Sequence, residues 1–167
     1  NISCASFIPK PFTPFQWESE DNMESLKAKQ KHLLESIPTK KIKVSFHETP
    51  TSLIEGVLAR GDRRLNAVIL DAYKNGCTFD SWDDRFNFDG WMNAFEKNNI
   101  DPHFYTQRQR DFSELLPWDH LDYGVSRKFL EKENLKAHEN KTTPHCRIKC
   151  SGCGANRLNG GNCDARG

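Results

Sequence analysis

The fold class of this chain is decided by residues 49–76, TPTSLIEGVLARGDRRLNAVILDAYKNG, which carry two successive helices. A Thr-Pro pair at its start and a Ser-x-x-Glu pattern at 52–55 are helix-start signals, and Gly61 ends the first helix. A second helix is predicted from Asp62 to about Asn75, with Gly76 as its C-terminal cap. Helix following helix without an intervening strand indicates a mainly helical body.

The segments on either side extend this prediction. Apolar periodicity predicts helices at 19–37, 89–98 and 126–138, the first of them capped by Ser19 or Asp21. Alternation at 42–46 predicts a half-buried strand. We therefore expect an α+β, mainly α fold.

The two ends of the chain read differently from its middle. The first residues read as a short strand with no preceding structure to pair with, and a loop with three prolines follows at 9–17. Periodicity is lost from Asn140 onward. We expect an N-terminal edge strand with its exit loop at 1–18, a helical region at 19–139, and an irregular cysteine-rich, metal-binding tail at 140–167. The lone strand also indicates a fragment of a longer protein.

Composition narrows the class of protein. The 167 residues are 36% hydrophobic and 28% charged, with a net charge of +1, and no apolar run is long enough to span a membrane. Without a signal segment, the expected location is cytoplasmic. Near-neutral charge argues against a protein held to nucleic acid mainly by phosphate contacts. From Val125 onward, however, nine Lys and Arg face four Asp and Glu, so the C-terminal end is basic.

The tail contains four of the six cysteines, at Cys146, Cys150, Cys153 and Cys163. Thiolates at this spacing, with glycines between them, can converge on one centre. Four sulfurs suit a zinc ion or an iron–sulfur cluster, and ligand type alone does not decide between the two. A disulfide pair and an unstructured tail are the competing interpretations. The remaining two, Cys4 and Cys77, are expected to be buried free thiols.

Three other groups of side chains are candidate sites. The segment 118–122, WDHLD, places an imidazole between two carboxylates, but the structural interpretation is favoured, with Trp118 as a buried anchor. Three arginines, at positions 60, 63 and 64, are expected on an exposed face, paired with Asp62 or Asp71. Six aromatic residues are expected in the core: Phe79, Trp82, Phe86, Phe88, Trp91 and Phe95.

Four ordered blocks of the sequence carry a resemblance. They are SFIPKPFTPFQW at 6–17, EGVLARGDRRL at 55–65, LPWDHLDYGVS at 116–126, and TTP at 142–144 leading into the cysteines. Together they resemble the C-terminal region of cobalamin-binding-domain radical S-adenosylmethionine iron–sulfur proteins. The resemblance covers essentially the whole chain.

The resemblance implies that 1–18 is the last edge strand and exit loop of a radical S-adenosylmethionine barrel. The resemblance implies that the parent is an enzyme that uses a [4Fe-4S] cluster, S-adenosylmethionine and cobalamin. Its substrate is unknown, and RNA and protein are both candidates. Its cobalamin-binding and barrel domains are absent from this chain, so the chain alone is expected to be inactive. No catalytic or cofactor-binding residue is assigned.

One motif needs separate treatment, because the C-x3-C-x2-C spacing of Cys146, Cys150 and Cys153 equals that of the radical-generating cluster. Only 14 residues follow Cys153, and Cys163 offers a fourth ligand, so we expect an auxiliary or structural metal site instead. The alternative function is a non-catalytic zinc-knuckle module that docks on RNA or protein.

Overall fold

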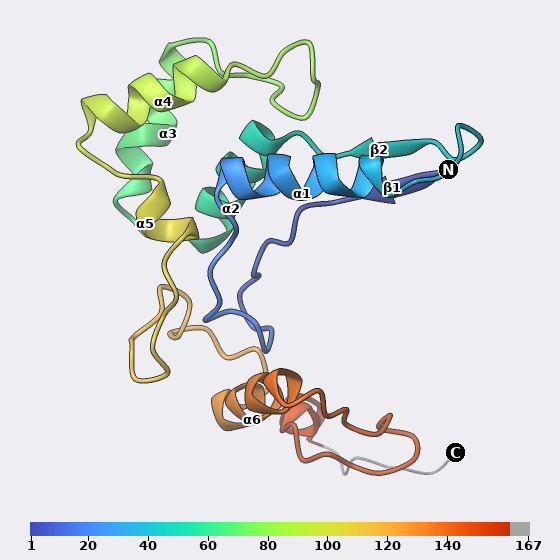
Figure 1. Ribbon diagram of the computed structural model, residues 1–167. Coiled ribbons are helices and arrows are strands. Elements are labelled where there is room, and N and C mark those ends of the chain that lie inside the picture. Colours follow the sequence, from blue (N-terminus) through green and yellow to red (C-terminus); the bar gives the residue numbers. More distant parts are fainter. Residues whose placement is uncertain (161–167) are drawn as a thin grey trace. The chain divides into compact units, whose positions relative to one another are not determined.

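The computed structural model describes residues 1–160 and is mainly helical, which confirms the predicted fold class (Figure 1). The chain divides into two compact units. The first unit comprises Asn1–Ile8 and Ser19–Gln109, and the second comprises Pro9–Glu18 and Arg110–Gly167. Both units are therefore built from two separate segments. The boundaries that the sequence suggests, after residues 18 and 139, stay a prediction about the parent protein.

The first unit begins with a strand–helix–strand arrangement. Strand β1 (Ile2–Cys4) pairs in parallel with β2 (Val44–Phe46), Ile2 opposite Val44 and Cys4 opposite Phe46. Parallel neighbours need a long crossover connection, and here it contains helix α1 (Met23–Glu35). The expectation that the first strand has nothing to pair with was wrong, because its partner follows it in the sequence rather than preceding it.

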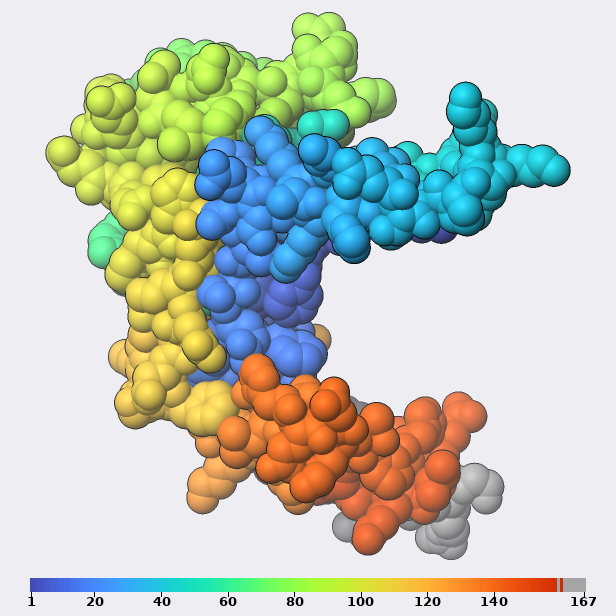
Figure 2. Space-filling view, in the orientation of Figure 1, coloured from blue at the N-terminus to red at the C-terminus, as the bar shows by residue number. Residues whose placement is uncertain are grey.

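Helix α1 lies at the surface of this unit, where Figure 2 shows it in blue. Its N-cap is Asn22, whose Oδ1 accepts a hydrogen bond from Ser25 N at 2.8 Å. The sequence-based choice of Ser19 or Asp21 was therefore wrong by one to three residues. No residue of α1 is buried, so this helix contributes little to the core.

Four helices form the core of the first unit. They are α2 (Thr49–Arg60), α3 (Leu65–Lys74), α4 (Phe88–Lys97) and the short α5 (His103–Thr106). Their inward faces, together with Cys77 from the loop after α3, supply one apolar cluster: Leu53, Ile54, Val57, Leu65, Val68, Ala72, Cys77, Trp91, Ala94, Phe95 and Tyr105. The two helices read from residues 49–76 thus provide about half of the core, and Gly61 separates them as predicted.

Three side chains of the first unit differ from expectation. Arg60 is fully buried, so the three arginines share no exposed face, although Arg64 does pair with Asp62 at 2.6 Å. Phe79 and Trp82 are 76% and 65% exposed and lie outside the core. Helical spacing predicts which residues share a face, but it does not say what covers that face.

The second unit contains helix α6 (Arg127–His138) and a short 3-10 helix, Ala155–Asn159. Its core consists of Trp17, Leu116, Trp118 and Leu130, with Phe12, Phe112, Val125 and Phe129 packed against them. The proline-rich loop therefore packs onto the segment before α6 within one unit. No helix of residues 1–160 is long and apolar enough to cross a membrane.

Candidate functional site: the cysteine tail and the adjoining groove

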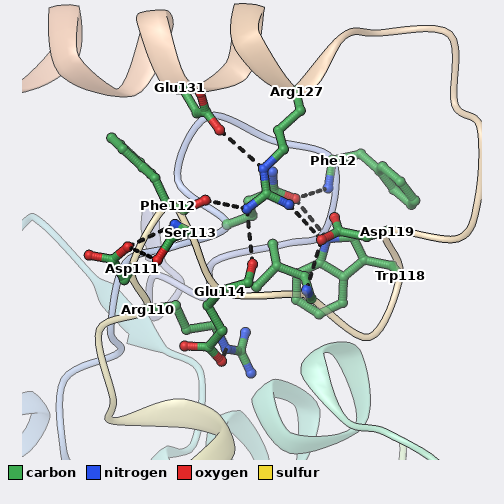
Figure 3. Close-up of polar contacts among 12 residues, drawn as sticks. Phe12, Arg110, Asp111, Phe112, Ser113, Glu114, Trp118, Asp119, Arg127 and Glu131 are labelled. Atoms are coloured by element: carbon green, nitrogen blue, oxygen red, sulfur yellow. Dashed lines mark hydrogen bonds and ion pairs between the residues drawn. The ribbon is translucent and has the colours of Figure 1, made fainter.

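Arg127, the first residue of α6, organises the polar contacts around this site (Figure 3). Its guanidinium bonds to the carboxylates of Asp119 and Glu131. It also donates to the main-chain carbonyls of Phe112 at 2.6 Å and Glu114 at 2.9 Å. All three guanidinium nitrogens are used, so Arg127 is a structural clamp that fixes the loop of residues 112–119 to α6.

The end of α6 nearest this clamp also holds the cysteine tail. Ser126 N donates to the carbonyl of Cys153 at 2.8 Å, and Arg157 reaches the carbonyl of Gly124 at 3.4 Å. Gly124 has a φ of +82°, and a Cβ there would lie 2.5 Å from Leu158 Cδ1. A glycine is thus required both by the turn and by the 3-10 helix packed on it.

The start of the tail is tied to α6 by a small hydrogen-bonded network. Thr143 Oγ1 donates to Glu133 Oε1 at 2.7 Å. Lys136 Nζ donates to Thr143 Oγ1 at 2.6 Å and to Glu133 Oε1 at 2.9 Å. The hydrogen bond from Thr143 lowers the pKa of the Glu133 carboxyl, and Lys136 lowers it further. The tail is therefore attached to α6 before its first cysteine and again at its third.

Among the predicted metal ligands, Cys146 and Cys150 are exposed and Cys153 is half-buried, all three as free thiols. Cys163 lies outside the described residues. Within residues 1–160, no group of three or more His, Cys, Asp or Glu side chains is arranged to hold a metal. The described part of the tail therefore contains three of the four proposed donors but not a preformed site.

The donor chemistry and the backbone of the tail nevertheless fit a metal. Gly152 and Gly154, on either side of Cys153, have φ values of +72° and +94°, which allow the chain to reverse direction around that cysteine. Exposed thiols can also move toward a common centre, because nothing packs them into the core. Metal sites of this kind often form only when the ion binds.

A groove of about 570 Å³ adjoins the tail in the second unit. Its aromatic wall is formed by Phe12 and Tyr123, whose rings stack with centroids 4.8 Å apart and planes 16° apart. Gln16 and Arg157 also line it. The sequence did not predict the stacked pair of Phe12 and Tyr123 or the groove, because both depend on contacts between positions more than 100 residues apart.

The WDHLD segment lies along this groove, and Trp118 is buried, as predicted for an anchor. Trp118 is 6% exposed and donates from Nε1 to Gln16 Oε1 at 2.7 Å. Asp119 accepts from Leu116 N at 2.8 Å besides binding Arg127, and Asp122 accepts from Gly124 N at 2.8 Å. Both carboxylates are engaged in holding turns.

The two isolated cysteines complete the inventory of thiols. Cys77 is buried as expected, and burial raises the pKa of its thiol, with a smaller contribution from Asp80. Cys4 is only half-buried. Neither is near the tail cysteines in the sequence.

Comparison with known proteins gives no match, whether with protein-family models, curated proteins or solved structures. The function is therefore inferred from the residues and geometry of this chain.

Proposed function

We propose that this chain is the C-terminal region of a cobalamin-binding-domain radical S-adenosylmethionine enzyme, and that its tail binds an iron–sulfur cluster or a zinc ion. The observation that carries the proposal is the parallel β1–α1–β2 unit, in which the loop of residues 9–17 lies between β1 and α1. Parallel strands joined through a helix are the repeating unit of β/α barrels, and active sites of such barrels lie at the C-terminal ends of their strands.

The position of the proline-rich loop supports the same proposal. It leaves the C-terminal end of β1, the end at which a barrel would bind its cofactors. Within the second unit, this loop packs on Trp118 and Leu130. The radical-generating cluster, S-adenosylmethionine and cobalamin belong, in this proposal, to other parts of the parent.

At the tail, the ligands would be the thiolates of Cys146, Cys150, Cys153 and Cys163. A bound iron–sulfur cluster would supply electron transfer or structural rigidity, and zinc would supply rigidity only. The chain itself contributes cationic neighbours at Arg147, Lys149 and Arg157, which favour the thiolate form of the cysteines and offset the charge of the loaded site.

Anaerobic preparation of this chain tests the metal. We expect bound iron and sulfide with the absorption and Mössbauer signature of an iron–sulfur cluster, lost in the variant Cys146→Ser/Cys150→Ser/Cys153→Ser. The matched control Cys4→Ser/Cys77→Ser should retain it. Colourless protein with one zinc per chain would favour the zinc-knuckle alternative, and metal-free protein would refute a tail site of either kind.

Two observations test the relation to the parent enzyme. The coding sequence upstream of Asn1 should contain a second C-x3-C-x2-C motif within a β/α-barrel pattern. The chain alone should form no 5′-deoxyadenosine from S-adenosylmethionine under reducing conditions. Measurable 5′-deoxyadenosine would instead assign the radical-generating cluster to Cys146, Cys150 and Cys153.

A further inference from the structure

The groove of the second unit contains an aromatic platform that the metal site does not explain. Phe12 covers one face of the Tyr123 ring, yet the Tyr123 side chain remains 61% exposed. Most of the Tyr123 residue is therefore open to solvent despite this stacking. An open, flat ring in a groove of about 570 Å³ is a surface on which another planar ring can stack.

Phe12 is held beneath this platform at a conformational cost. Its φ of +59° lies in the left-handed region, which is unfavourable for a non-glycine residue. The conformation is fixed because Phe12 N donates to Gln16 Oε1 at 2.9 Å, and the same oxygen accepts from Trp118 Nε1. Gln16 is only 3% exposed. Both bonds use its oxygen, so the Gln16 side chain fixes the position of Phe12 at the edge of the groove that both residues line.

The groove is lined by two carboxylates, Asp119 and Asp122, which are engaged by Arg127 and by main-chain amides, while the tail segment that adjoins it is positively charged. Residues 140–160 contain Lys141, Arg147, Lys149 and Arg157 and no Asp or Glu. Arg157 lines the groove, and its guanidinium bonds to the carbonyls of Gly124 and Gly154. Among the described residues no carboxylate pairs with it, in contrast to Arg127, so its full positive charge acts on whatever enters the groove.

We propose that the second unit binds single-stranded nucleic acid, with an unpaired base stacked on Tyr123 and the adjoining phosphates held by Arg157 and the basic tail. Every base has a π face, so stacking on an exposed aromatic ring is tolerant of sequence, and a neighbouring groove of cations follows the backbone. A duplex keeps its base faces stacked internally. The selectivity should therefore be for single strands over duplexes.

This inference does not depend on the parent enzyme or on the metal, because the residues that carry it are Phe12, Gln16, Tyr123 and Arg157. The strongest competitor is a peptide, since Leu115 and Leu121 on the same groove are 84% and 55% exposed. Charge decides between them here. Residues 140–160, with four Lys and Arg and no Asp or Glu, are complementary to phosphates and offer nothing specific to an apolar peptide.

The test is fluorescence anisotropy with fluorescein-labelled ten-residue oligo(U), its oligo(dT) counterpart, and a hairpin duplex of similar charge, at 50 and 200 mM salt. We expect both single strands to bind more tightly than the duplex. Tyr123→Ala should weaken binding by about tenfold or more, and Tyr123→Phe should restore it. Arg157→Gln should reduce the salt slope by about one. Tighter binding of oligo(U) than oligo(dT) would identify RNA as the preferred strand.

The matched control is Tyr73→Ala, because Tyr73 is 66% exposed but lies on α3 in the first unit. The proposal would be overturned if the Tyr73 and Tyr123 variants lost affinity equally, or if the duplex bound as tightly as the single strands. It would also be overturned if no oligonucleotide bound, a result that would favour a peptide as the ligand. Photocrosslinking of wild-type chain to a 4-thiouridine oligonucleotide gives a readout independent of variant folding. Crosslinks confined to the first unit would also overturn it.

Discussion

At Gly56, the absence of a side chain makes room for a buried carboxylate. This glycine lies in the middle of α2, and a Cβ on it would overlap both carboxylate oxygens of Glu20, which is only 8% exposed. Glycine to alanine in a helix interior normally stabilises by about 1 kcal/mol. We expect Gly56→Ala to do the opposite and to cost about 1–3 kcal/mol, measured as the change in urea-unfolding free energy.

The cause of that loss is separable by a double-mutant cycle. In a Glu20→Ala background, Gly56→Ala should lose most of its cost, because the colliding carboxylate is gone. An equal cost in both backgrounds would show that the collision with Glu20 is not responsible.

Gln16 illustrates a residue whose role depends on a contact 102 positions away. Its Oε1 satisfies both Trp118 Nε1 and Phe12 N, so Gln16→Met would leave two donors without an acceptor in a largely buried place. We expect the second unit to lose about 1–3 kcal/mol of stability in urea unfolding. The loss should be smaller in a Trp118→Phe background, where one donor is already absent, and an undiminished loss would contradict the pairing.

Such residues explain what sequence reading could not reach at this scale. Trp118 was predicted as a buried anchor because a large aromatic ring in a polar segment requires cover. The hydrogen bonds of Gln16 and the burial of Arg60 were not predicted. A buried polar side chain needs partners, and the identity of a glutamine or an arginine does not reveal which distant residues supply them. The tail cysteines were the candidate metal ligands easiest to recognise from the sequence, since ligand type and spacing are local properties.

At the scale of elements, local start and stop signals were good predictors. Helices α2, α3, α4 and α6 lie within a few residues of the positions expected from caps and apolar spacing. Pairing of β1 with β2 was missed because it joins residues about 40 positions apart, and three-residue strands leave no pattern that specifies a partner.

Helix α6 offers a direct test of capping. Ser126 Oγ accepts a hydrogen bond from Phe129 N at 3.3 Å, and the helix that it begins carries Arg127 and the attachment points of the tail. We expect Ser126→Ala to destabilise the second unit by about 1 kcal/mol, because the Phe129 amide loses its side-chain acceptor and keeps only the main-chain carbonyl of Ser126. Thermal unfolding followed by circular dichroism measures it. Ser126→Asp should restore stability, whereas identical melting of the Ala and Asp variants would argue against a capping role.

At the scale of the whole molecule, both units depend on carboxylates whose pKa values fall on folding. A hydrogen bond from Arg64 lowers the pKa of Asp62, one from Lys97 lowers that of Asp71, and one from Thr143 lowers that of Glu133. Groups of this kind stabilise the fold when ionised. Their contribution is fully present above the unfolded-state pKa values, near 4, and disappears as the pH falls through the lower folded-state values.

The chain should therefore have nearly constant unfolding free energy between pH 7 and 5 and lose stability progressively below about pH 4. Urea unfolding at pH 7, 5, 4 and 3 measures this. Asp62→Asn should flatten the decline of the first unit, because the variant has no proton to take up at that position, whereas Asp83→Asn, an exposed control, should leave the profile unchanged. An unfolding free energy that stays constant or rises down to pH 3 would contradict the role of these carboxylates. The contrast between the two variants isolates the contribution of Asp62 to the acid sensitivity of the fold.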